Sequence, residues 1–459
     1  MNVNDSVLDL IGKTPLVRLN RMVEPGMATV YVKMEQLNPG GSVKDRMAYN
    51  MVRRAEEAGD LKPGATLVES TSGNTGLGLA MTAAVRGYKA IFTMPDKMSK
   101  EKIDMLKAYG AEVIVTRTDL DHEHPDSYVE VAKRVARETA GGFYTNQYYN
   151  MDNPEAHYMT TGPEIWADTG GKIDALVAGI GTGGTVSGTA KYLREKAAEA
   201  GRDFMVVCPD PVGSIYKSMH ETGKPCPTSS YVVEGIGHDF MVGTLDLTMI
   251  DEVREISDRD SFLAARRLAR EEGIFCGGST GTAIHGGLQL ARELGEGKMV
   301  VIILCDSGDR YLSKLYDDEW MRDMGYVQPR GTAGKVADLL KTDAAKVEMA
   351  QPNDQLADVA SRMSELGISQ MPIAPAADDP RMFMIHESDL LRSLVSGVCQ
   401  PSDPVSTAAK ELQGRVSPQD SLSRVQQVLE EDNVAVVVDD DALVGIVSKI
   451  DLIEHLTRA

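Results

Sequence analysis

The chain has few cysteines and no sequence signal for a membrane or for secretion. Its five cysteines, among 459 residues, lie far apart without a CxxC pair, which argues against a disulfide framework or a zinc site. No apolar run approaches the length that spans a bilayer, and the opening residues, MNVNDSVLDLIGKTPL, lack the basic and apolar segments of a secretory signal. We therefore expect a cytoplasmic protein with no metal and no membrane partner.

The chain also lacks an excess of positive charge. Acidic residues outnumber basic ones 68 to 48, which gives a formal net charge of −20. Such a surface repels nucleic acids and anionic membranes over a Debye length, so no nucleic-acid partner is expected. The length exceeds what one hydrophobic core usually supports, and we expect two or three domains.

The first 326 residues alternate between strand-like and helix-like stretches. The runs TLVES, EVIVT, DALVAGI and MVVIILC are typical of strands, whereas GLGLAMTAAVRG and SFLAARRLAREEG are typical of helices. This alternation predicts an α/β architecture of parallel sheets with helices on both faces, in which ligands bind where strands end and helices begin. VQPRGTAGK then interrupts the pattern, so we place the first domain at 1–326 and a linker at 327–340.

Three glycine-containing segments lie at predicted loop-to-helix junctions. NPGGSVKDR at 38–46 carries Lys44, STSGNTG at 70–76 offers hydroxyls and backbone amides, and GTGGT at 181–185 offers a phosphate cradle. A reactive amine beside two anion sites favours pyridoxal 5′-phosphate, whose aldehyde forms a Schiff base with a lysine. GTGGT alone would equally suit the packing of an ordinary strand-to-helix turn, and the three segments in this order are more specific.

The first domain resembles the fold-type II pyridoxal-phosphate enzymes, and within them the cystathionine β-synthases and cysteine synthases. The resemblance runs from about Ser6 to about Tyr326. It rests on six motifs in family order: GKTPLVRL at 12–19, GGSVKDR around Lys44, TSGNTG at 71–76, GTGGT at 181–185, EGIG at 234–237 and GGSTG at 277–281. It implies a tryptophan synthase β-like fold of two α/β subdomains, with pyridoxal 5′-phosphate as cofactor.

The resemblance also implies a role for each matched residue. Lys44 matches the Schiff-base lysine, Asn74 the residue that hydrogen-bonds the cofactor's 3′-oxygen, and Ser279 the residue facing the pyridine nitrogen. Because a neutral hydroxyl does not keep that nitrogen protonated, Ser279 favours elimination of a β-substituent. The phosphate loop is matched by Gly181, Thr182, Gly183, Gly184 and Thr185. The substrate-binding positions are matched by Thr71, Ser72, Asn74, Thr75, Gln147, Tyr148, Glu234, Gly235 and His238.

These parts imply a β-replacement in which Lys44 removes the Cα proton of L-serine and L-homocysteine replaces the hydroxyl, giving L-cystathionine and water. The alternative is a cysteine synthase that joins O-acetylserine and sulfide, because both share every cofactor motif. Asp45 directly after the lysine, and the tail described below, favour the first.

Two features depart from well-known cystathionine β-synthases. His238 stands where they carry a tyrosine, and it either steers the second thiol or leaving group or is an ordinary polar residue. The first motif begins at Gly12, which leaves no room for the haem-binding extension of the animal enzymes. We therefore expect no haem.

The tail consists of two similar halves, each reading as a helix, two short strands and a helix. It resembles a tandem pair of CBS domains, a Bateman module, which we place at 341–400 and 401–459. GIVSKIDL at 445–452 matches the family's ribose-contacting pattern, which implies nucleotide contacts at Ser448 and Asp451. In the first half Asp389 matches, but His386 replaces the serine.

S-adenosylmethionine or an adenine nucleotide is the implied ligand of this module, and a pair that serves only dimerisation is the alternative. Family members with this architecture lead us to expect a homodimer or homotetramer. A third possibility is a nucleotide sensor without catalysis, against which the intact Lys44, Asn74 and Ser279 argue.

Overall fold

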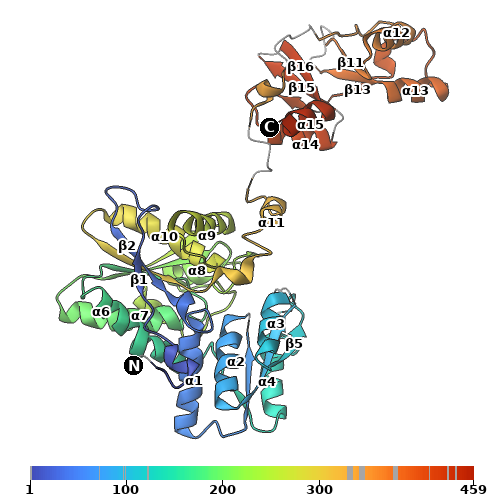
Figure 1. Ribbon diagram of the computed structural model, residues 1–459. Coiled ribbons are helices and arrows are strands. Elements are labelled where there is room, and N and C mark those ends of the chain that lie inside the picture. The colour runs from blue at the N-terminus through green and yellow to red at the C-terminus, as the bar shows by residue number, and fades with distance from the viewer. Residues whose placement is uncertain are drawn as a thin grey trace. The chain divides into compact units, whose positions relative to one another are not determined.

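The computed structural model describes residues 3–71, 73–96, 98, 100–120, 124–327, 334–340, 347–375, 381–412, 414–431, 434–439 and 442–458. The chain divides into two units, Met1–Tyr326 and Val327–Ala459 (Figure 1). None of the helices in these described ranges is both long and apolar enough to cross a bilayer.

Two sheets organise the first unit. The larger has the order β1 (Leu16–Arg18), β2 (Thr29–Met34), β10 (Met299–Leu304), β7 (Ala175–Val177), β8 (Met205–Pro211) and β9 (Glu252–Ile256). The smaller has the order β5 (Glu112–Thr116), β4 (Lys89–Pro95), β3 (Thr66–Ser70) and β6 (Gly142–Tyr144). Every pairing is parallel except that of β1 with β2. The predicted α/β architecture of parallel sheets is confirmed.

Helices alternate with these strands along the chain. The α-helices are α1 (Lys44–Ala58), α2 (Asn74–Arg86), α3 (Lys100–Ala108), α4 (Tyr128–Glu138), α5 (Asp152–Ala156), α6 (Gly162–Asp168), α7 (Gly184–Glu199), α8 (Tyr216–Thr222), α9 (Asp258–Glu272), α10 (Gly278–Leu294) and α11 (Asp318–Asp323). Short 3₁₀ segments are η1 (Val7–Leu10), η2 (Glu35–Leu37), η4 (Leu247–Met249) and η5 (Gly308–Tyr311), and η3 (His157–Thr161) is a π-helical turn.

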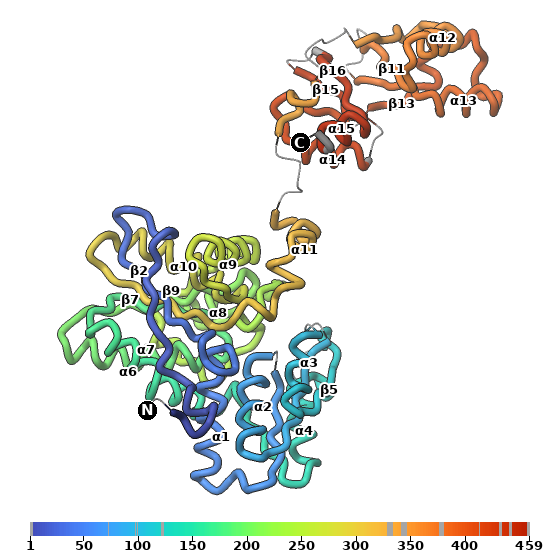
Figure 2. Tube along the Cα trace, viewed as in Figure 1, coloured from blue at the N-terminus to red at the C-terminus, as the bar shows by residue number. Residues whose placement is uncertain are grey.

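Helices cover both faces of each sheet. Because consecutive strand residues point to opposite faces, one strand can pack against helices on both sides. In β3, Leu67 belongs to the core formed with Leu77 of α2, whereas its neighbour Val68 packs with Ala132 of α4. In β10, Val301 packs in the core that includes α7, whereas Ile302 meets α10 at Gly287. Figure 2 follows the Cα trace through α7 and α10 of this unit. An ideal Cβ at Gly287 would lie 2.4 Å from Ile302 Cδ1, so the absence of a side chain brings α10 close to the sheet.

The predicted loop-to-helix junctions are confirmed at three places. Lys44 is the first residue of α1, Asn74 the first of α2 and Gly184 the first of α7. Gly183, which precedes α7, has φ +82°, in the left-handed region where a side chain is disfavoured. The glycines thus permit the sharp turns that aim two helix N-termini at one place.

The second unit contains two three-stranded sheets, each with its own core, and a third buried cluster joins them through Met384 of one sheet and Val436 of the other. The strands are β11 (Gln370–Ile373), β12 (Phe383–His386) and β13 (Lys410–Glu411) in one, and β14 (Arg415–Val416), β15 (Val434–Asp439) and β16 (Ala442–Ser448) in the other. The helices are η6 (Val336–Leu339), α12 (Leu356–Leu366), α13 (Glu387–Val395), η7 (Val405–Thr407), α14 (Leu422–Glu431) and α15 (Lys449–Arg458). The repeated helix, strand, strand, helix pattern is confirmed, whereas β13 and β14 have too few residues to show a period in the sequence.

Candidate active site

A cavity of about 630 Å³ in the first unit collects most of the predicted site residues. That volume falls within the roughly 300–1,000 Å³ of small-molecule sites. The predicted residues that line it are Lys44, Asn74, Thr75, Gln147, Tyr148, Gly181, Thr182, Gly183, Thr185, Glu234, Gly235, His238 and Ser279. Thr71 and Gly184 lie next to it without lining it, and Ser72 lies outside the described residues.

Thr71 and Gly184 each have a structural task beside the cavity. The Thr71 hydroxyl accepts hydrogen bonds from the backbone N–H groups of Gly73, at 3.0 Å, and Gly76, at 3.1 Å, so it stabilises the first turn of α2. At Gly184, an ideal Cβ would lie 2.0 Å from Asn153 Oδ1. A glycine is therefore required there for the close approach of Asn153 to the start of α7.

Cys305 also lines the cavity and follows β10 directly. Burial raises the pKa of its thiol to about 11, although the charge of nearby Lys44 acts in the opposite direction. The thiol is therefore protonated near neutral pH and is not a nucleophile. Its position at the carboxyl end of a central parallel strand was the available sequence signal.

Thr75 and Gln147 form a polar pair with a fixed orientation. Thr75 Oγ1 donates to Gln147 Oε1 at 2.6 Å, and Gln147 Nε2 donates to the Ser70 carbonyl at 2.8 Å. Beneath them lies Glu69, a fully buried carboxyl that accepts hydrogen bonds from the backbone N–H groups of Ser70 and Gln147 and from the Thr145 hydroxyl. Burial raises the pKa of Glu69 to about 7 against the effect of these donors. The sequence offered no signal for Glu69 beyond its place in a buried strand.

Asn74 is held from two sides by charged residues that the sequence analysis missed. Its Nδ2 donates to Asp306 Oδ2 at 2.8 Å, and its Oδ1 accepts a hydrogen bond from the Arg310 guanidinium. Arg310 also binds the Gly40 carbonyl, and the Tyr311 hydroxyl donates to Asp306 Oδ2 at 2.7 Å. The amide plane of Asn74 is thus fixed, while the second hydrogen on Nδ2 remains for another acceptor.

The glycine loop before α7 has the features of a phosphate site. No side chain caps this helix, so its first N–H groups are available to an anion. At Gly181 an ideal Cβ would lie 2.3 Å from the Gly235 carbonyl oxygen, and only glycine allows this close approach. The hydroxyl of Thr182 accepts a hydrogen bond from Asn153 Nδ2 at 3.0 Å, which ties the loop to α5. An uncapped helix end beside the Lys44 amine fits pyridoxal phosphate.

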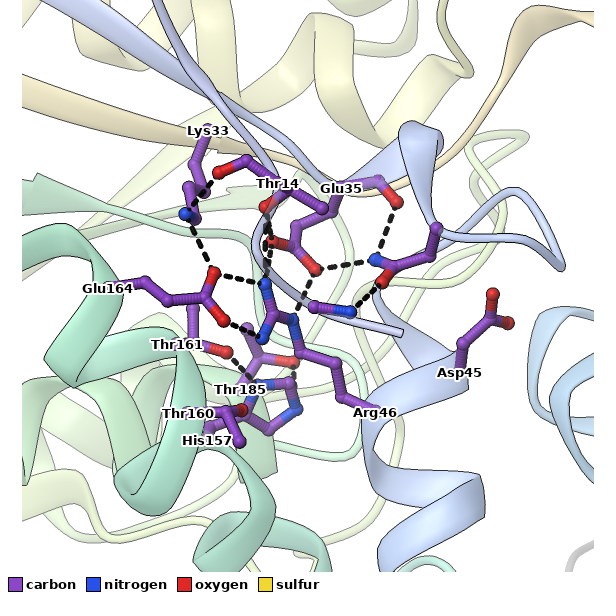
Figure 3. A network of polar contacts seen from close by, with 12 residues as sticks. Thr14, Lys33, Glu35, Asp45, Arg46, His157, Thr160, Thr161, Glu164 and Thr185 are labelled. Carbon is purple, nitrogen blue, oxygen red and sulfur yellow. Dashed lines mark hydrogen bonds and ion pairs between the residues drawn. The ribbon is translucent and has the colours of Figure 1, made fainter. Parts of the chain in front are cut away.

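A buried ionic network supports the start of α1 (Figure 3). Arg46 donates from Nε to Glu35 Oε2 at 2.7 Å and from Nη2 to Glu164 Oε2 at 2.7 Å, and Lys33 Nζ lies 2.9 Å from the same Glu164 oxygen. Burial raises the pKa of Glu35, but the charge and hydrogen bonds of Arg46, with the Thr14 hydroxyl and the charge of Lys33, together outweigh it and the net pKa is lowered. Burial also raises the pKa of Glu164, but the charges and hydrogen bonds of Arg46 and Lys33 together lower it to about 2. The network thus holds Arg46, two residues after Lys44, in one orientation.

His157 connects this region to the glycine loop. Its Nδ1 lies 2.9 Å from the Thr161 hydroxyl and its Nε2 lies 3.2 Å from the Thr185 hydroxyl (Figure 3). Burial, reinforced by the charge of Arg46, lowers the pKa of His157 to about 3. A neutral imidazole can bond both hydroxyls at once, so this histidine is a structural link rather than a proton donor at neutral pH.

In the second unit, the predicted nucleotide residues have different surroundings. Ser448 donates to Asp451 Oδ2 from its backbone N–H, at 2.9 Å, and from its hydroxyl, at the start of α15. Asp389 is buried and forms an ion pair at 2.5 Å with Lys410 from β13. His386 precedes α13 without a side-chain cap. Lys410 lies within 401–459, but β13 pairs with β12 of the first half, so that half has a lysine beside its aspartate that the sequence analysis missed.

The fold and the site together define a fold-type II pyridoxal-phosphate enzyme: a lysine at a helix start and an uncapped glycine loop open into one cavity. The family model described as pyridoxal-phosphate dependent enzyme matches residues 7–306, and the CBS domain model matches residues 414–458.

The chain is similar to known proteins over its whole length. The cystathionine β-synthase of Dictyostelium discoideum is 37% identical over 100% of this chain and 93% of its own. The cysteine synthase of Staphylococcus aureus strain N315 is 44% identical over 67% of this chain and 96% of its own. The crystal structure of an O-acetylserine dependent cystathionine β-synthase from Helicobacter pylori is 35% identical, with a TM-score of 0.63, and covers 68% of this chain and 99% of its own. The chain belongs to the cystathionine β-synthase family, and pyridoxal phosphate is its cofactor.

The buried neutral His157 predicts a pH-dependent stability of the first unit. Because its pKa is about 3 in the folded state and about 6.5 in the unfolded state, the unfolded state binds more protons between these values. Stability is therefore lost as the pH falls below about 6.5, by about 2 kcal/mol at pH 5. Urea unfolding followed by the fluorescence of Trp166 and Trp320, both in this unit, measures the effect.

A His157→Gln variant provides the comparison, because an amide also bonds two hydroxyls but does not titrate. We expect it to lose about 2 kcal/mol less than the parent between pH 7 and pH 5. An equal loss in the two proteins would contradict a neutral, buried His157.

Proposed function

We propose that this enzyme condenses L-serine with L-homocysteine to L-cystathionine and water, the β-replacement of reverse transsulfuration. The supporting observation is the convergence in one cavity of the Lys44 amine, the Thr75 and Gln147 pair, and the uncapped start of α7. The match to a cystathionine β-synthase over the whole chain, tail included, favours this reaction over cysteine synthesis.

When bound, pyridoxal phosphate supplies an electron-withdrawing ring next to the substrate Cα. Lys44 would hold the cofactor aldehyde through Nζ, the amides at the start of α7 its phosphate, and Ser279 its ring nitrogen. Asn74, fixed by Asp306 and Arg310, would donate its remaining Nδ2 hydrogen to the 3′-oxygen. These residues set the plane in which the substrate bonds are broken.

The substrate carboxylate would bind at the start of α2 beside Thr75 and Gln147. Gly73, before the first residue of α2, has no side chain to cap the helix, and Thr71 takes the N–H of Gly76, so the N–H groups of the two residues before Gly76 and the helix dipole favour a carboxylate. The Lys44 amine would take the Cα proton of the bound substrate. The protonated ammonium would then donate to the leaving hydroxyl, because hydroxide is a poor leaving group.

O-acetylserine is a second candidate for the first substrate, since the Helicobacter pylori relative is O-acetylserine dependent. Acetate leaves without general-acid help, so a site that uses O-acetylserine does not need Lys44 to protonate the leaving group. His238 lines the same cavity. Its ring centroid lies 5.2 Å from that of Tyr148 and 4.8 Å from that of Phe240. This packing gives His238 a place in the aromatic wall of the cavity.

The test is a product assay of the holoenzyme with L-serine plus L-homocysteine, run beside O-acetylserine plus sulfide. We expect cystathionine from L-serine as the dominant product. A Lys44→Ala variant should lose at least about a hundredfold in kcat in either assay, because it lacks the proton-transfer group. Dominant cysteine from O-acetylserine would overturn the proposed substrates while leaving the cofactor assignment intact.

We also propose that S-adenosylmethionine or an adenine nucleotide binds the second half of the tail at Ser448 and Asp451. In the first half, Lys410 already neutralises Asp389, so that carboxylate is a poorer acceptor for ribose hydroxyls. In the second half, Asp451 accepts hydrogen bonds from the backbone N–H and the hydroxyl of Ser448 at the start of α15, and its position in the sequence resembles a ribose-contacting one.

Thermal denaturation with each ligand tests this proposal. At a ligand concentration about 100 times Kd, we expect about 2.7 kcal/mol of stabilisation of the second unit. Asp451→Ala should abolish the shift and Asp389→Ala should leave it. A shift that survives Asp451→Ala, or no shift with any of these ligands, would contradict the assignment.

A cytoplasmic homodimer or homotetramer completes the proposed picture. The oligomeric state rests on family membership, and the location rests on the lack of a secretory signal in the opening residues. Light scattering of the purified holoenzyme would measure the oligomeric state.

A further inference from the structure

A cluster of three charged side chains lies in the cavity wall, separate from Lys44. Glu234 accepts from Lys314 Nζ at 2.5 Å through Oε1 and from Lys102 Nζ through Oε2. All three residues line the cavity. Lys102 comes from α3, beside the smaller sheet, whereas Glu234 and Lys314 come from segments after β8 and β10. The cluster therefore joins the two halves of the first unit across the cavity.

The charges of this cluster do not cancel. Burial raises the pKa of Glu234, but Lys102 and Lys314 outweigh it and the net pKa is lowered, so the carboxylate is ionised. Two ammonium groups then face one carboxylate, which leaves one positive charge. The side chain of Lys102 is 3% exposed and that of Lys314 is 26% exposed. Lys314 is thus the member that solvent and substrate can reach.

Lys314 also has hydrogen-bonding capacity to spare. An ammonium carries three N–H donors, and one of them is given to Glu234. Lys102, in contrast, is enclosed, with its Nζ 5.0 Å from the centre of the Tyr311 ring. A second carboxylate that entered the cavity would find donors on Lys314 and a favourable field from both lysines.

The proposed reaction supplies such a carboxylate. It brings two amino acids into one cavity, and the first is held by the start of α2 with Thr75 and Gln147. The amino-acid thiol needs a different cationic partner for its own carboxylate. Among the residues that the structure describes, the lysines that line the cavity are Lys44, Lys102 and Lys314, and Lys44 is committed to the cofactor.

We propose that Lys314, assisted by Lys102, binds the α-carboxylate of the second substrate, the amino-acid thiol. This inference rests on the proposed function and extends it, because the contact would let the enzyme prefer a thiol that carries a carboxylate over one that does not. Glu234 would orient the two lysines in the free enzyme and share Lys314 with the incoming carboxylate. Lys314 is then a determinant of which product the enzyme forms.

The test compares two thiols that differ only in the carboxylate, L-homocysteine and 3-aminopropane-1-thiol, each with saturating L-serine. The quantity measured is the ratio of their kcat/KM values in the parent holoenzyme and in Lys314→Gln and Lys314→Arg. We expect the ratio to fall about tenfold in Lys314→Gln, as for the loss of one charge-assisted hydrogen bond, mainly through a higher KM for L-homocysteine. Lys314→Arg should retain most of the ratio.

Lys217 provides a matched control. Its ammonium lies 2.7 Å from Glu221 on α8, outside the cavity lining, so Lys217→Gln removes a lysine ion pair without changing the cavity charge. Its ratio should equal that of the parent. Visible absorbance of the bound cofactor and the melting temperature verify that each variant is folded.

The outcomes separate this inference from the function on which it rests. Equal losses with both thiols in Lys314→Gln would overturn the carboxylate site and leave the lysine a structural role, while cystathionine formation by the parent would still support the proposed function. A parent that forms no cystathionine would overturn the proposed function and this inference together.

Discussion

The buried ion pair between Arg46 and Glu35 is the interaction on which the arrangement of the catalytic residues depends. Glu35 follows β2, and Arg46 belongs to α1, so the pair attaches the helix that begins with Lys44 to the larger sheet. Removing either partner would leave an uncompensated buried charge, which costs about 3–5 kcal/mol in well-studied cases. Glu164 and Lys33 extend the attachment to α6, where Asp168 gives Lys33 a second carboxylate at 3.4 Å. The position of Lys44 is therefore set by electrostatics behind it rather than by contacts at its amine.

The packing of α2 against α1 also positions Asn74 and the start of α2. At Gly78 of α2 an ideal Cβ would lie 3.2 Å from the Lys44 carbonyl oxygen, so the two helices touch with almost nothing between them. The start of α2 thereby follows the start of α1, and Asn74 comes to lie where Arg310 and Asp306 hold its amide. Two helix N-termini and one lysine are positioned together because each depends on the same packed backbone.

The parts of this site that the sequence predicted are those whose chemistry is local. A lysine at a helix start and a glycine loop before another helix can be recognised from neighbouring residues alone, as at Lys44 and Gly183. Glu69, Asp306 and Lys410 could not be recognised in this way, because each acquires its role from partners far along the chain. Glu69 reads as one residue of a buried strand until Gln147 and Thr145 are brought to it. The departure at His386 predicted that the first half of the tail differs, but not that Lys410 would pair with Asp389.

The charge distribution of the cavity opposes that of the whole chain. The protein carries a formal charge of −20, which repels amino-acid carboxylates and the cofactor's phosphate at long range. Among the described residues, the cavity wall instead combines three lysines with two carboxylates, Glu234 and Asp239, and the starts of α2 and α7 add their N–H groups. Three anionic groups must be held apart in one site, a phosphate and two carboxylates, and like charges in a low dielectric repel strongly. The structure offers each anion a different kind of partner, backbone amides at α7 for the phosphate, amides with Thr75 and Gln147 at α2 for one carboxylate, and an ammonium for the other. Such a division of partners lets a single cavity bind three anions without any two competing for the same donors.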